Sequence, residues 1–208
     1  MYRTTTCTMA AIAVLAATAA PALGQACLGI PAGNGQFALG PTASFMENAK
    51  SYGGDFQANL DGAVSIGAGY ALTDIDEVDA NGNTLSGSAA YELAAGSVSV
   101  CPTAGVEYTW FSEGDVSATT FPVGIGIGKS FSAGESLSIT PYVMPQYLHM
   151  RSTAEFGGVS ATVSENEFGG LLGLQLGTDR IYGGGGLSMT TIDESEPVYF
   201  VGLGFVIR

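Results

Sequence analysis

Short runs in which apolar residues alternate with small or weakly polar ones recur along most of this 208-residue chain. The run 64–73 alternates apolar residues with Ser, Gly, Ala and Thr, and the run 121–128 repeats the pattern. Successive side chains of a β-strand point to opposite faces, so a period of two indicates strands. Many such strands with no helical stretch among them favour a sandwich or a barrel.

The alternation predicts ten strands, at 36–46, 53–60, 63–74, 84–94, 97–111, 119–131, 136–150, 167–177, 181–191 and 197–207. Four breaks are tight and carry the glycine or aspartate that hairpin turns need, and they lie at 61–62, 95–96, 133–134 and 178–180. The other five breaks are longer and more acidic, and lie at 47–52, 75–83, 112–118, 151–166 and 192–196. Because tight and long breaks alternate, an up-and-down order would place the tight turns and both termini at one end, and the long loops at the other.

Charge content decides whether the apolar face of these strands points inward or outward. A water-facing surface needs about 25–35% charged residues, whereas this chain has 12%, most of them in the predicted loops. Glycine and small side chains on the other strand face suit a crowded lumen, and the apolar face suits lipid. Strands of about 9–11 residues match the hydrocarbon thickness, and closure leaves no backbone group unpaired in lipid. We therefore predict an all-β fold, a closed antiparallel up-and-down transmembrane β-barrel of ten strands.

Several aromatic residues stand near the predicted strand ends, as they do in the aromatic girdles of membrane barrels. They are Tyr70, Tyr91, Tyr108, Trp110, Phe121, Tyr147, Tyr182 and Tyr199. They support the membrane barrel only weakly, because any all-β protein is rich in aromatic residues.

The first 26 residues are predicted to form a signal peptide that is cleaved before Cys27. Residues 9–20 are apolar but too short to cross a bilayer of roughly 30 Å as a helix, and small residues, Gly24 and Ala26, stand where a signal peptidase reads. A buried N-terminal helix and a lipidated Cys27 are the alternatives. The mature chain is divided into a periplasmic N-terminal segment, 27–35, and a barrel, 36–208.

Charge and cysteine content narrow the class of partner and the compartment. Without the signal the chain keeps five basic and 19 acidic residues, which argues against nucleic acid and against a basic patch on anionic lipid. Cys27 and Cys101 remain, and two cysteines in an exported chain are expected to form a disulfide. Because Cys101 and the mature N-terminus fall at the tight-turn end, the bond would hold 27–35 against the periplasmic mouth.

The last predicted strand, 197–207, alternates Tyr199, Val201, Leu203, Phe205 and Ile207 with smaller residues. This resembles the closing strand of bacterial outer-membrane β-barrel proteins, and with the signal sequence and loop pattern the chain resembles the superfamily of small outer membrane protein A-like and opacity-type barrels. The resemblance implies a place in the bacterial cell outer membrane, contact with its lipid and recognition of the last strand by the barrel-assembly machinery. The family usually ends on Phe or Trp, whereas this chain ends on Arg208. It often has eight strands, which is the alternative to ten.

Polar residues on the lumen side are the first candidates for function. The apolar parity places Asp55, Gln57, Asn59, Glu92, Glu107, Gln146 and Gln175 inside the barrel. A carboxylate buried without a partner is costly, so we expect Glu92 and Glu107 to bind Tyr or Gln side chains or lumen water. A polar conduit is the alternative. The glycines of 122–128 face Tyr142, Met144 and Gln146 of the next strand, which predicts a lumen largely filled by side chains.

An acidic break could bind a cation. Asp74, Asp76, Glu77 and Asp79 offer oxygen ligands of the kind that calcium prefers. The segment lacks the glycine of an EF-hand loop, so a solvated acidic loop is the favoured interpretation. No metal, cofactor or nucleotide motif is predicted.

His149, the one histidine of the chain, lies near the outer end of its predicted strand. Its position, with Asp74 and Asp76 near another strand end, resembles the omptin proteases, which carry an Asp-x-His pair at the loop rim. Here the paired position is Tyr147, and no serine partner accompanies the histidine. We therefore expect no enzyme but a barrel with acidic extracellular loops and a structural or surface-interaction role. A narrow channel for small polar solutes is the alternative, and an omptin-like or lipid-modifying enzyme comes third.

Overall fold

The computed structural model describes residues 37–60, 63–75, 80–95, 98–111, 115–134, 136–156, 158–191 and 196–207. The strands in this part of the chain are β1 (Phe37–Phe45), β2 (Ala49–Asn59), β3 (Val64–Ile75), β4 (Ala80–Tyr91), β5 (Leu93–Ala95), β6 (Val98–Phe111), β7 (Asp115–Gly128), β8 (Phe131–Ala133), β9 (Leu137–Phe156), β10 (Val159–Gly177), β11 (Ile181–Thr190) and β12 (Val198–Ile207). Within these ranges no helix is long and apolar enough to cross a membrane.

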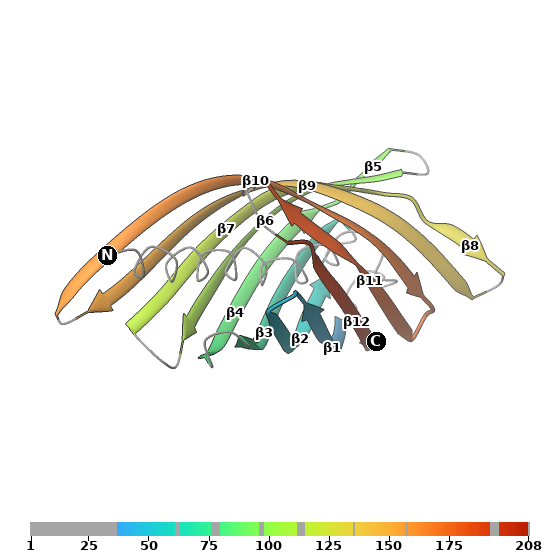
Figure 1. Ribbon diagram of the computed structural model, residues 1–208. Helices are drawn as coiled ribbons and strands as arrows, with labels where there is room; N and C mark the ends of the chain where they lie inside the picture. The colour runs from blue at the N-terminus through green and yellow to red at the C-terminus, as the bar shows by residue number, and fades with distance from the viewer. Residues whose placement is uncertain are drawn as a thin grey trace.

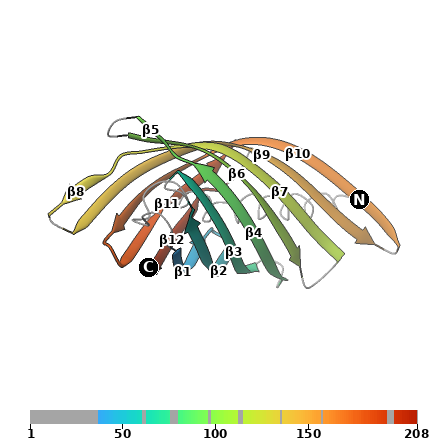
Figure 2. The same cartoon turned by 180° about the vertical axis from the view of Figure 1, so that it is seen from behind.

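Ten of these strands form one closed antiparallel barrel (Figures 1 and 2). Each pairs with the next along the chain, while the short strands β5 and β8 extend two of the hairpins by pairing with β6 and β9. The ring closes where β1 pairs with β12, from Phe37 opposite Ile207 to Phe45 opposite Tyr199. The predicted ten-stranded barrel is confirmed, and the eight-stranded alternative is wrong.

The strand register fixes the tilt of the barrel. Followed from strand to strand, one row of paired residues runs through Gln175, Gly184, Gly202, Thr42, Gly53, Ala71, Thr84, Thr109, Ala118, Ser152 and Val163. The row therefore returns to β10 twelve residues from its start. A stagger of this size across ten strands tilts them by about 40° from the barrel axis.

Compared with a water-soluble protein, the distribution of side chains is reversed, with apolar residues outside and polar residues inside. Outward positions carry large apolar residues that stay exposed, such as Leu172 (57%) and Leu203 (60%). Inward positions hold buried polar residues from nine of the strands, and these are Ser44, Ser51, Asp55, Gln57, Ser65, Thr73, Thr84, Thr103, Glu107, Thr109, Thr120, Thr140, Gln146, Gln175 and Ser188. An apolar exterior of this extent is stable only in lipid, so the predicted orientation of the strands is confirmed.

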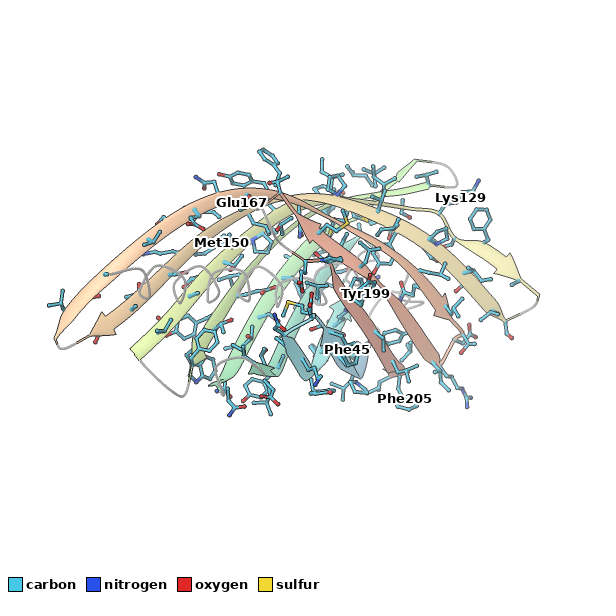
Figure 3. The ribbon with its side chains drawn as sticks, in the orientation of Figure 1. Phe45, Lys129, Met150, Glu167, Tyr199 and Phe205 are labelled. Carbon is cyan, nitrogen blue, oxygen red and sulfur yellow. The ribbon has the colours of Figure 1, made fainter. Side chains whose placement is uncertain are left out.

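Two rings of outward aromatic side chains border the apolar band. The outer aromatic ring consists of Phe45, Tyr52, Tyr70, Tyr108, Trp110, Phe121, Tyr147, Phe168 and Tyr199, and the inner aromatic ring of Phe37, Phe56, Tyr91, Phe131 and Phe205. Neighbours within a ring contact each other, as Tyr147 and Phe168 do edge to face with 5.4 Å between ring centroids. In Figure 3, Phe205 lies toward the right-hand, tight-turn end and Glu167 toward the other. Tyr182, expected in a girdle, instead points into the lumen and is 1% exposed.

The predicted position of the chain ends is confirmed. The N–H group of Val206 in β12 donates to the carbonyl of Arg180, in the turn between β10 and β11. The last residues of β12 therefore lie beside a tight turn, and β1 begins next to them because Phe37 pairs with Ile207.

The predicted contrast between tight and long breaks is wrong in three places. Only residues 46–48 separate β1 from β2, and only residues 112–114 separate β6 from β7. The segment 151–166 is a strand hairpin with Gly158 in its turn at a φ of 83°. This segment carries Thr and Val, which favour strands, but it lacks the apolar face that the rest of the two strands presents to lipid. Its polarity reflects surroundings outside the membrane and not a loop conformation.

Candidate functional site

Large side chains fill the lumen. One apolar cluster joins residues from five strands, and these are Ala90, Cys101, Tyr142, Met144, Leu171 and Phe200. A second pair, Leu148 and Met150, lies further toward the outer end of β9. Met144 and Leu171 are each 1% exposed. The interior is therefore packed, as the sequence predicts.

Glycine makes room for the largest of these side chains. A Cβ atom on Gly173 of β10 would lie 2.5 Å from the Tyr142 hydroxyl oxygen, far inside van der Waals contact. Tyr142 thus leans toward β10, and not toward the glycines of β7 as predicted. Gln146 takes the predicted place, because a Cβ on Gly124 of β7 would be 3.2 Å from its Cβ.

One polar contact in the lumen joins two strands that are not neighbours. The Tyr182 hydroxyl on β11 donates to Oδ2 of Asp55 on β2 at 3.5 Å, and the Gln57 amide donates to the same oxygen at 3.3 Å. Asp55 is 5% exposed, and its Oδ1 has no hydrogen-bond partner among the described residues. This cluster ties β11 to β2 over the lumen side of β12 and β1, which lie between them.

Besides Asp55 and Gln57, three more of the predicted lumen residues are buried where expected. Glu107 is 4% exposed, Gln146 is 5% and Gln175 is 3%. In the described part of the chain, no partner is found for Glu107 Oε2, Gln146 Oε1 or either amide atom of Gln175. Such buried groups need hydrogen bonds, and ordered water is the partner that fits a polar lumen. The prediction that Glu107 binds a Tyr or Gln side chain finds no support.

Glu92 lies apart from the other three. It follows β4 at the tight-turn end, is half-buried and accepts a hydrogen bond from Ser99 Oγ. Ser99 is eight residues before Glu107 on β6, which corresponds to roughly 27 Å along a strand. Glu92 and Glu107 therefore form no carboxylate pair.

The acidic segment that was a candidate for calcium is only partly described. Asp74 is exposed on β3, while Asp76, Glu77 and Asp79 lie outside the described residues. In the ranges that the structure covers, no three His, Cys, Asp or Glu side chains come close enough to hold a metal ion. Calcium binding by the whole segment stays a prediction.

His149 lies beside Phe121, a member of the outer aromatic ring. Its ring stacks on Phe121 with 6.2 Å between centroids, and its Nδ1 atom lies 2.7 Å from Oδ1 of Asn166. Asp74 projects outward from β3, and β4, β6 and β7 separate that strand from β9. The structure thus does not bring the histidine and Asp74 together.

Cys101 is fully buried on the lumen side of β6 and is disulfide-bonded. The other two cysteines, Cys7 and Cys27, lie outside the described residues. Pairing with Cys27, like the signal peptide and the segment 27–35, therefore stays a prediction.

No protein-family model and no curated protein matches the chain. Solved structures of bacterial barrels do match. The translocator domain of the autotransporter NalP from Neisseria meningitidis is 13% identical, with 85% of this chain and 89% of that chain covered at a TM-score of 0.49. The N-terminal β-barrel domain of Pseudomonas aeruginosa OprF is 16% identical (84% and 99% covered, TM-score 0.43), and the outer membrane protease OmpT from Escherichia coli is 9% identical (89% and 93%, 0.40).

These identities and TM-scores are low, so the fold assignment depends on the strand pairing and surface of this chain itself. A closed antiparallel barrel with an apolar band between two aromatic rings is the architecture of bacterial outer-membrane barrels. The chain is thus a small β-barrel protein of the bacterial outer membrane.

Proposed function

We propose that this barrel is a non-enzymatic, non-conducting membrane protein that acts through its outer end, as a structural element or by contact with other molecules. The packed lumen carries this proposal: Tyr182, Met144 and Leu171 are each 1% exposed. A solute path needs a continuous polar channel, whereas the apolar cluster of this lumen brings together side chains from five strands.

Ion conductance of the purified protein in planar lipid bilayers tests the proposal. We expect no stable openings above the baseline of protein-free bilayers. Large, stable openings from protein whose heat-modifiable gel migration shows a folded barrel would overturn it.

A narrow channel for small polar solutes is the second candidate. The unpartnered polar atoms of Glu107, Gln146 and Gln175 favour it, because water that satisfies them would form part of a polar path. Small, brief openings in the same bilayers, together with uptake of small uncharged solutes by proteoliposomes, would favour this candidate over the first.

An enzyme of the omptin or lipid-modifying kind receives the least support. His149 stacks on Phe121 and its Nδ1 contacts the Asn166 amide oxygen, so the partner of this ring nitrogen is neither a carboxylate nor a hydroxyl group. Assays of peptide and phospholipid hydrolysis with the wild type and His149→Ala should show no activity in either. Hydrolysis that the substitution abolishes would establish the enzyme.

The proposed partners of the outward-facing strand surface are the lipid of the outer membrane and the barrel-assembly machinery. The outward face of β12 presents Leu203 (60% exposed) and Phe205 (61%), which gives the machinery an apolar, aromatic strand to recognise. Replacing Phe205 with Ser should slow assembly in cells, measured as the fraction of barrel with heat-modifiable migration. Unchanged assembly would contradict this role.

A further inference from the structure

The hairpin of β9 and β10 projects beyond the other strands at the outer end of the barrel (Figure 1). β9 and β10 pair along their whole length, from Ser138 opposite Gly177 to Phe156 opposite Val159. β7 supports the other side of β9 as far as Glu155. β6 in turn pairs with β7 up to Trp110 opposite Ser117, so the sheet continues on that side and β10 is its edge.

The pairing of β10 with β11 stops well before the tip of this hairpin. Its last ladder pair is Gly169 with Thr190, followed by a hydrogen bond from the Thr191 N–H to the Phe168 carbonyl at 2.8 Å. No described strand pairs with residues 159–167 on that side. Phe168 belongs to the outer aromatic ring, so this free stretch lies above the lipid.

The direction of the free backbone groups follows from Phe168. Its N–H and carbonyl both point to the β11 side, where they bond Thr191. Along an antiparallel strand, the backbone groups of successive residues point alternately to the two sides. The N–H and carbonyl groups of Ser160, Thr162, Ser164 and Asn166 therefore point to the free edge, and we call these four residues the β10 edge.

The β10 edge lacks most of the features that protect an edge against strand addition. Proteins block exposed edges with proline, charged side chains, bulges or short strands, and the stretch 159–168 contains no proline, lysine or arginine, so that its charges are those of Glu165 and Glu167. It pairs with β9 without interruption. Val159 is 71% and Val163 44% exposed beside it. In the part of the chain that the structure describes, the edge is thus open to another strand.

We propose that the β10 edge binds an extended basic peptide segment of a partner protein, which adds to the sheet as a further strand. Backbone hydrogen bonds would hold it, as in other cases of β-strand addition. On one face its side chains would lie beside Val163, Glu165 and Glu167, which suits valine and lysine or arginine. On the other they would lie beside the hydroxyl groups of Ser160, Thr162 and Ser164.

Charge selects this occupant over a second copy of the chain. The protein has a formal charge of −13, and two paired edges would bring Glu165 and Glu167 of both copies into one small sheet. Like charges across strands destabilise pairing, whereas opposite charges stabilise it. The inference rests on the proposed surface-interaction function and names where the contact occurs and with what.

The test uses the full barrel in lipid nanodiscs and a labelled ten-residue peptide that alternates Lys or Val with Ser or Thr. Binding is followed by fluorescence anisotropy at low salt. Thr162→Pro removes an edge N–H but no backbone bond to β9, and proline is tolerated at such edge positions. It also removes the Thr162 hydroxyl, which lies 3.2 Å from Thr153 Oγ1 on β9. Thr162→Ala, which loses the same hydroxyl but keeps the N–H, is the matched control.

We expect the wild type and Thr162→Ala to bind alike and Thr162→Pro to bind at least about tenfold more weakly, a loss of about 1.4 kcal/mol. The double variant Glu165→Gln/Glu167→Gln, which keeps every backbone group, should also weaken binding of the lysine peptide. Equal binding by wild type, Thr162→Pro and the double variant would overturn the proposal. So would no binding to the wild type, or a wild-type dimer that Thr162→Pro dissociates.

The conductance measurement separates this inference from the proposed function. A barrel that conducts no ions and does not bind the peptide refutes only the proposal that the β10 edge binds a peptide. A barrel with large openings refutes the non-conducting function, whatever the peptide result.

Discussion

Tyr182 lies directly over Gly204, its partner across β11 and β12. A Cβ atom on Gly204 would be 2.3 Å from Cζ of the tyrosine ring. The tyrosine can reach past β12 and β1 to Asp55 on β2 because the residue beneath its ring has no side chain. This glycine thus leaves room for the contact between β11 and β2.

Gly204→Ala should therefore destabilise the barrel. The added methyl group must displace a ring that is 1% exposed, and overpacking of this kind costs about 1–3 kcal/mol. Urea unfolding of the protein in lipid vesicles measures the loss. Gly87→Ala is the control, since the nearest atom to its Cβ would be Val106 Cγ1 at 3.9 Å. Equal unfolding midpoints for the two variants would contradict the packing described here.

Emptying the apolar cluster should make the barrel conduct. Met144→Ala with Phe200→Ala removes two of its large side chains, and we expect ion openings in planar bilayers where the wild type shows none. The control is Val143→Ala with Val201→Ala, which truncates the outward neighbours on the same two strands (44% and 50% exposed). A silent Met144→Ala/Phe200→Ala variant that is still folded would show that other side chains close the lumen.

Trp110 reports the depth of the outer aromatic ring. It is the one tryptophan of the chain, and its ring stacks on Tyr108 with 5.7 Å between centroids. Its fluorescence should be quenched more by lipids brominated near the headgroup than by lipids brominated near the chain end, since tryptophan prefers the interface. Moving the tryptophan to Leu172, in the background Trp110→Phe, should reverse the order. If the two brominated lipids quenched both proteins in the same order, the assigned depth of the outer aromatic ring would be wrong.

A peptide map without reducing agent should join Cys101 to Cys27 in the mature protein. The loop that this bond closes contains about 75 residues, for which the chain-entropy model gives about 4.5 kcal/mol of stabilisation. Cys27→Ser should lower the unfolding midpoint accordingly, and Cys7→Ser should leave it unchanged if the signal is removed. Free thiols at both Cys27 and Cys101 would contradict the pairing.

Strand number and facing could be predicted because lipid imposes a strict rule on the exterior. Along β12, Tyr199, Val201, Leu203 and Phe205 all face outward with 50% exposure or more, so alternation alone assigns the faces. Outside the lipid, outward side chains need not be apolar. Residues 151–166 continue as strands without an apolar face, and no sequence pattern separates them from a polar loop.

The sequence predicted which residues face the lumen, but not which contacts they make there. Parity places Glu107, Gln146 and Gln175 inside. Tyr182 was assigned to the wrong face because the four glycines after it, 183–186, provide no alternation from which to infer its facing. Its contact with Asp55 depends on the pairing of β11, β12, β1 and β2, which sets the two residues level with each other, and not on any local pattern.

The pairing of the first strand with the last has a consequence for biogenesis. Phe37 and Ile207 are about as far apart in sequence as two residues of the barrel can be, yet they are neighbours. A chain that lacks β12 would have no stable partly inserted state in the bilayer. The backbone N–H and C=O groups at the edges of β1 and β11 would then lie unpaired in hydrocarbon. Insertion must therefore wait for synthesis and export to finish, and a carrier has to keep the polypeptide from aggregating in the meantime.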